Sequence, residues 1–174
     1  MAGGLRIAAV TGAASGLTDP ILAELADRLT AEGLRVSGAV QRTTPSSALR
    51  NKTMELVLLP DRRVVTISEE RPPGAPGCSL DPGVFETVAA EVAARIAPGA
   101  DVAILSKFGQ REIEGQGLRA AIVAAVEHDL PLLIGVAPAR VAAFEAFVGG
   151  PVTCLPAAVP PLQRWVRDNL GQLA

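Results

Sequence analysis

Three segments of the sequence carry residues suited to binding a small anion. Each follows a short apolar run: residues 11–19 (TGAASGLTD), 41–47 (QRTTPSS) and 106–117 (SKFGQREIEGQG). Small residues in the first segment let backbone N–H groups approach an anion, and the helix predicted to follow adds partial positive charge at its N-terminus. We therefore expect phosphate or oxyanion binding there. The alternative is a tight turn that needs glycine for its geometry.

The first segment supplies most of the candidate ligand contacts. Aligned with the phosphate-binding loop G-x-x-x-x-G-K-[ST], it places Leu17 where the lysine belongs and Thr11 where the first glycine belongs. The hydroxyl of Thr18 can still reach a Mg²⁺ ion, but Leu17 has no charge to neutralise phosphates. The candidate contacts in this loop are Gly12, Ala13, Ala14, Ser15, Gly16, Leu17 and Thr18.

The candidate catalytic residues lie in the segment that begins at Ser106. A phosphate-transferring enzyme would carry an acidic residue after this strand, but Lys107 stands there instead. We expect its ammonium to replace, in space, the cation missing at Leu17. Glu112 is expected to position a water molecule or hold Mg²⁺, and Arg111 to contact phosphate oxygens. The alternative is a charged, solvated loop.

Further candidates follow the apolar run at residues 36–40, which we predict to be the second strand. Gln41, Arg42 and Thr43 end that strand at the same sheet edge and are expected to contact a base or a phosphate. Asn51 and Lys52 precede the next strand and are placed to fold back over the site.

Composition excludes several classes of protein. The chain has 174 residues, a net charge of −2, two Cys, one His and no Tyr. No apolar run is long enough to span a membrane, and no basic block suggests nucleic acid as a partner. A Cys/His zinc site would need nearly every Cys and His in the chain, and a Ser-His-Asp triad would have to use His128. We expect a cytoplasmic protein, with a homo-oligomer left open.

Apolar runs alternate with helical patterns along the whole chain. Strands are expected at 5–10, 36–40, 101–106, 132–136 and 152–155, and two more, at 54–59 and 64–68, form a hairpin. The first helix is expected to begin at Thr18 or Asp19, either of which can cap it, and the second to begin after Asp81. Further helices are expected over 117–128, 139–148 and 160–170. This order predicts one α/β domain over residues 1–174, with three layers and a mostly parallel sheet.

Three remaining residues are expected to have structural rather than catalytic or binding roles. Cys154 lies in an apolar run and is expected in the core. Cys78, in the Pro/Gly-rich loop at 69–80, is expected to be a small turn residue rather than a reactive thiol. His128 is expected at the surface, beside a helix C-terminus.

Two enzyme families share parts of this pattern. TGAASGL resembles the glycine-rich turn TGxxxGxG of the short-chain dehydrogenases, but their catalytic Tyr-x-x-x-Lys is impossible in a chain without Tyr. The loop, the hairpin KTMELVLLPDRRVVTIS and the segment SKFGQRE together resemble the small P-loop nucleoside-triphosphatases related to the human cancer-related NTPase. That resemblance implies a P-loop NTPase-like fold with degenerate nucleotide-binding motifs and the inserted hairpin.

The segments GCSLD (77–81) and SKFGQREIEGQGLR (106–119) carry a closer resemblance. The chain is similar to an uncharacterised bacterial domain-of-unknown-function family, often encoded near molybdate-transport genes. Together the resemblances imply a nucleoside triphosphate-binding protein with weak or absent Mg²⁺-dependent hydrolysis. The alternative is a non-enzymatic accessory protein that binds an oxyanion such as molybdate, or a protein partner, in molybdenum handling.

Overall fold

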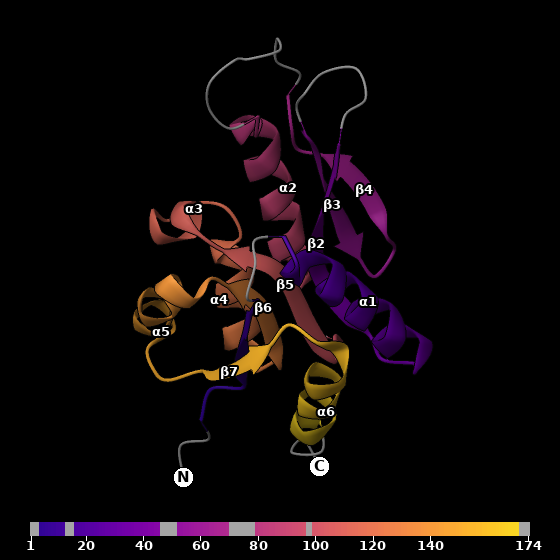
Figure 1. Cartoon of the computed structure of the whole chain (residues 1–174), viewed down its shortest axis with the longest axis vertical. Coiled ribbons are helices and arrows are strands. Elements are labelled where there is room, and N and C mark those ends of the chain that lie inside the picture. The colour runs from indigo at the N-terminus through magenta and orange to yellow at the C-terminus, as the bar shows by residue number, and fades with distance from the viewer. Residues whose placement is uncertain (1–3, 13–15, 46–51, 70–78, 97–98, 171–174) are drawn as a thin grey trace.

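The computed structural model describes residues 4–12, 16–45, 52–69, 79–96 and 99–170. Strands and helices alternate along the chain (Figure 1). The strands are β1 (Ile7–Thr11), β2 (Val36–Pro45), β3 (Lys52–Leu59), β4 (Arg63–Thr66), β5 (Val102–Phe108), β6 (Leu132–Val136) and β7 (Thr153–Pro156). The helices are α1 (Thr18–Ala31), α2 (Pro82–Arg95), α3 (Gln110–Ile113), α4 (Arg119–Glu127), the 3₁₀ helix η1 (Pro138–Arg140), α5 (Val141–Val148) and α6 (Val159–Leu170).

The strands form one seven-stranded sheet in the order β4-β3-β2-β5-β6-β1-β7. The pairs β2–β5, β5–β6, β6–β1 and β1–β7 are parallel. Beyond β2, the pairs β2–β3 and β3–β4 are antiparallel. The hairpin is therefore part of the same sheet, and the predicted mostly parallel α/β fold of P-loop NTPase-like type is confirmed.

Helices cover both faces of the sheet and make three layers (Figure 1). Alternate residues of each strand face opposite sides: Ile7 and Ala9 of β1 belong to the core beneath α2 and α4, whereas Ala8 and Val10 belong to the core beneath α1 and α6. None of the described helices combines the length and apolar character that crossing a bilayer requires.

The first two long helices begin in different ways. In α2 the Asp81 carboxylate accepts a hydrogen bond from the backbone N–H of Val84, and a proline occupies the first turn, as predicted. In α1, Leu17 is the N-cap residue and no side chain caps the helix, so the predicted cap by Thr18 or Asp19 is wrong. Both residues instead lie in the first turn of α1.

The last strand, β7, forms one edge of the sheet and pairs only with β1 among the described strands. Its residues are mostly exposed, and Cys154 is an exposed free thiol. The prediction that Cys154 lies in the core is therefore wrong, because an apolar run on an edge strand is covered less fully than one on a central strand. His128 ends α4 at the surface, as predicted. Cys78 lies outside the described residues.

Candidate functional site

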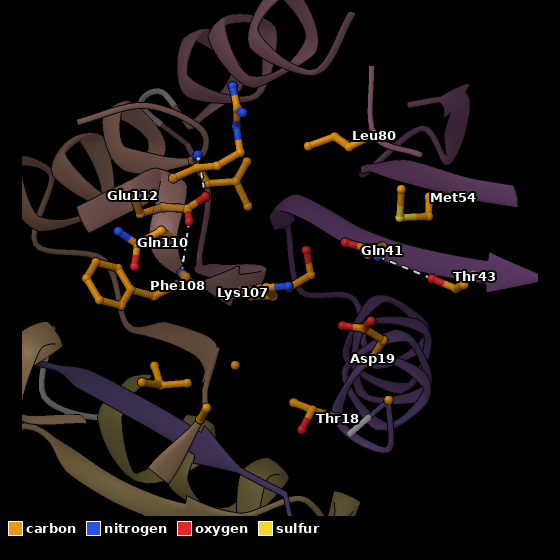
Figure 2. Close-up of a pocket in the computed structure, with 18 of the residues that line it drawn as sticks. Thr18, Asp19, Gln41, Thr43, Met54, Leu80, Lys107, Phe108, Gln110 and Glu112 are labelled. Atoms are coloured by element: carbon orange, nitrogen blue, oxygen red, sulfur yellow. Dashed lines mark hydrogen bonds between the residues drawn. The ribbon is translucent and has the colours of Figure 1, made fainter. Parts of the chain in front are cut away.

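A cavity of about 1300 Å³ opens at the edge where β1, β5 and β6 have their carboxyl ends (Figure 2). Its lining comes from the segments after these three strands, from β2 and β3, and from the start of α2. The order of the strands reverses at this part of the sheet, because β1 is followed, through α1, by β2, which lies beyond β6 and β5. Such reversal points are where open α/β sheets bind ligands.

Lys107 reaches the cavity from the end of β5. Leu105 pairs with Ile134 and Phe108 with Val136, so β5 carries one extra residue between these two pairs. This bulge leaves Lys107 exposed while its neighbours Ser106 and Phe108 stay buried. Figure 2 shows the Lys107 side chain extending into the cavity. The placement expected from the sequence is found, while the role of the ammonium stays a prediction.

Asp19, in the first turn of α1, faces Lys107 across the cavity (Figure 2). Burial raises the pKa of the Asp19 carboxyl from 3.8 to about 6, although the positive charge of Lys107 opposes this rise. Sequence reasoning treated Asp19 only as a helix cap. Its position directly after the glycine-containing loop was the signal that could have marked it as a site residue.

Glu112 holds the loop that follows β5. Its side chain is only 4% exposed, and its two carboxylate oxygens accept hydrogen bonds from the backbone N–H groups of Gly109 (2.9 Å) and Leu118 (3.0 Å). Gly117 makes this contact feasible: its φ is +65°, and a Cβ there would lie 2.3 Å from Glu112 Oε1. Glu112 lines the cavity, and each of its carboxylate oxygens already accepts one backbone hydrogen bond, whereas its contact with water or Mg²⁺ stays a prediction.

A second carboxylate, from α2, supports the same loop. Glu86 accepts hydrogen bonds from the Gly117 backbone N–H and from the Arg111 guanidinium, the latter at 2.7 Å. The Arg111 guanidinium also lies over the Phe85 ring, 5.6 Å from its centroid. Arg111 thus lines the cavity as expected, but much of its charge is balanced by Glu86. These contacts connect the wall of the cavity to α2.

Alternation along β2 separates its candidate residues. Gln41 and Thr43 line the cavity, and Gln41 Nε2 donates to Thr43 Oγ1 at 3.2 Å. Arg42 lies between them, so its side chain points to the opposite face of the strand. There it forms an ion pair with Glu55 of β3 at 2.6 Å. Arg42 therefore does not line this cavity, and its contact with a base or a phosphate stays a prediction.

The loop after β1 contributes Gly12, Gly16 and Thr18 to the cavity. Leu17 is 55% exposed and does not line the cavity, so its contact with a ligand stays a prediction. Gly135 of β6 allows the close approach of Thr18, because a Cβ there would lie 3.1 Å from Thr18 Cγ2 and 2.3 Å from the carbonyl oxygen of Ser106. The candidates Ala13, Ala14, Ser15 and Asn51 lie outside the described residues.

The described lining of the cavity is more basic than the chain as a whole. Four basic residues line it (Lys52, Lys107, Arg111 and Arg140) against two acidic ones (Asp19 and Glu112), whereas the whole chain has a net charge of −2. Arg140, at the end of η1, donates to the neutral Gln110 side chain at 3.2 Å and was not singled out from the sequence. The cavity can therefore attract and hold an anion.

Comparison with known proteins finds a curated relative and a family model that match the chain. It is 29% identical over 168 residues to the Molybdenum import ATP-binding protein ModC 2 of Bradyrhizobium diazoefficiens. The match covers 97% of this chain but only 19% of that protein, so the chain spans a small part of the length of the curated relative it matches. No solved structure matches the chain. A family model described as Protein of unknown function (DUF2478) matches residues 7–165, and the chain belongs to that family.

Proposed function

We propose that the cavity at the carboxyl edge of the sheet binds a nucleoside triphosphate, with little or no hydrolysis. The observation that carries this proposal is the meeting of Lys107 from β5 with the start of α1, beside the glycines of the loop after β1. The uncapped first turn of α1 offers backbone N–H groups, and Lys107 offers a full positive charge. Phosphate groups are the ligand that this combination of donors fits best.

A divalent cation would sit at the same end of the cavity. Thr18 and Asp19 both line that end and carry side-chain oxygens, and Mg²⁺ in nucleotide sites is commonly held by one or two protein oxygens together with phosphate and water oxygens. No group of three acidic, His or Cys residues able to hold a metal by themselves occurs in the part of the chain that the structure describes. The cation would therefore bind with the nucleotide and supply charge neutralisation.

Slow or absent hydrolysis follows from the same side chains. Positioning a water molecule for attack needs a free general base, and the two acidic residues that line the described cavity are Asp19 and Glu112. Glu112 is occupied by two backbone N–H groups, and Asp19 faces Lys107. The proposal therefore assigns binding to the cavity rather than turnover.

A second candidate function is favoured by the relative's name. That relative is a molybdenum import protein, and a tetrahedral oxyanion such as molybdate asks for donors similar to those of a phosphate. Under this alternative the chain would be a non-enzymatic accessory protein in molybdenum handling, and the loop after β1 would hold the oxyanion or contribute to a partner's site.

Calorimetric titration with ATP, GTP and molybdate, each with and without Mg²⁺, tests the proposal. We expect saturable nucleotide binding that Lys107→Ala weakens about 10- to 100-fold, since a hydrogen bond to a charged group is worth about 1.5–3 kcal/mol. Arg164→Ala is the matched control, because it removes a positive charge from an exposed position on α6 outside the cavity lining. Its affinity should equal that of the wild-type protein.

Two outcomes would contradict nucleotide binding in this cavity. Nucleotide affinity that is unchanged in Lys107→Ala would place the nucleotide elsewhere. Molybdate binding without nucleotide binding would favour the second candidate. Phosphate release measured with ATP and Mg²⁺ should remain near the rate seen without protein.

A further inference from the structure

The cavity has two ends of different chemical character. Lys107, Thr18 and Asp19 make a polar end beside the start of α1. The other end lies against the hairpin, where Met54 of β3 and Leu80, which precedes α2, line the cavity (Figure 2). A bare oxyanion would use only the first end.

The hairpin end presents an apolar surface with one polar strip. Met54 and Leu80 are partly buried and pack against the core, where the buried side chains of Ile67 and Phe85 lie in the same cavity wall. The backbone of Leu80 forms an isolated antiparallel bridge with Ser68, which fixes its position. This surface is therefore built on the sheet and can receive an apolar group without rearrangement of the core.

Gln41 and Thr43 of β2 supply the polar strip between the two ends. The Gln41 amide donates to Thr43 Oγ1, and no described residue donates to its carbonyl oxygen. An amide oxygen that accepts from none of the described residues, next to an apolar surface, suits the exocyclic or ring N–H group of a heterocycle. Figure 2 shows Gln41 lying between Lys107 and Met54.

We propose that the hairpin end of the cavity binds the base of the nucleotide, with Met54 and Leu80 against the ring and Gln41 at its N–H edge. This inference rests on the proposed function and adds to it where the base lies and which side chains contact it. A thioether packs well against the edge or face of an aromatic ring, so Met54 suits this contact. Gln41 is then a specificity-determining residue.

Titration with ATP and with tripolyphosphate, which has the phosphate chain but no ring, tests the inference. We expect ATP to bind at least about 10-fold more tightly, as a ring buried against apolar side chains adds more than about 1.4 kcal/mol. Gln41→Ala and Met54→Ala should each reduce this ratio several-fold while leaving tripolyphosphate affinity unchanged. Thr44→Ala is the matched control on β2, because Thr44 is exposed and does not line the cavity.

The ratio of ATP affinity to tripolyphosphate affinity within each variant distinguishes a lost base contact from a misfolded protein, because tripolyphosphate binding shows that the phosphate end is intact. Equal affinity for ATP and tripolyphosphate in the wild-type protein would overturn the inference and leave anion binding standing. A ratio that neither substitution changes would overturn it as well. If neither compound binds, the proposed function itself fails, and the assignment of the base end fails with it.

Discussion

The raised pKa of Asp19 gives a test of the site that needs no ligand. Its carboxyl has a pKa of about 6 in the folded protein, because it is buried against the cavity wall, and 3.8 is the ordinary value. Between these values the folded protein binds more protons than the unfolded chain, so its stability falls as pH rises from about 4 to about 6. Asp19→Asn has no proton to lose and should not show this fall.

The size of the effect follows from the shift itself. One pKa unit is worth about 1.4 kcal/mol, so a rise from 3.8 to about 6 sets an upper limit of about 3 kcal/mol. Asp19 is half-buried and reached by solvent through the cavity, which screens its charge. We therefore expect Asp19→Asn to gain about 1–2 kcal/mol over the wild-type protein as pH rises from 4 to 7.5.

Urea unfolding of both proteins at several pH values measures this gain: the free energy of unfolding of the variant minus that of the wild-type protein is compared between pH values. The comparison matters because Asp61 and Asp101, whose pKa values are lowered by hydrogen bonds from Arg95 and Arg35, lose stabilisation as pH falls and change stability in the opposite sense. They are present in both proteins and cancel. A gain that does not depend on pH, or a carboxyl NMR titration of Asp19 with its midpoint near 4, would refute the reasoning.

Two further predictions concern how the cavity wall is held. Glu112→Gln should lower the free energy of unfolding in urea by about 1–3 kcal/mol, because an amide can accept only one of the two backbone hydrogen bonds, whereas the exposed Glu114→Gln should change it little. Gly135→Ala should lower both ATP affinity and stability, the latter by about 1–3 kcal/mol, since its Cβ would lie 2.3 Å from the Ser106 carbonyl oxygen. Gly150→Ala, with its nearest atom at 3.4 Å, is the control, and an equal loss in both glycine variants would contradict the steric argument.

The order of strands and helices could be predicted because hydrophobic periodicity reports local structure directly. The strand at residues 132–136 has the predicted bounds. β2 was predicted to end at residue 40 but runs to Pro45, since its polar second half pairs with β3 along the hairpin. A polar strand held by a neighbouring strand leaves no apolar pattern in its own sequence.

The site could be predicted only as far as chain position determines it. Lys107 was expected at the cavity because it directly follows a buried strand, and it lies there. Arg42 was grouped with Gln41 and Thr43 because the predicted strand ended at residue 40, so alternation along residues 41–43 was not counted. The backbone contacts of Glu112 join residues in a folded loop, and the proximity of Asp19 to Lys107 depends on long-range packing. Neither leaves a pattern in the sequence.

The loop after β5 is fastened by Glu112 and Glu86 through hydrogen bonds that exist before any ligand arrives. This wall of the cavity is therefore preorganised: the conformational entropy of fixing it is lost during folding rather than during association. A ligand that enters the cavity therefore meets Lys107, near the end of β5, already in position. Changes that loosen either glutamate would weaken binding through the disorder of the empty protein, even where every group that touches the ligand is unaltered.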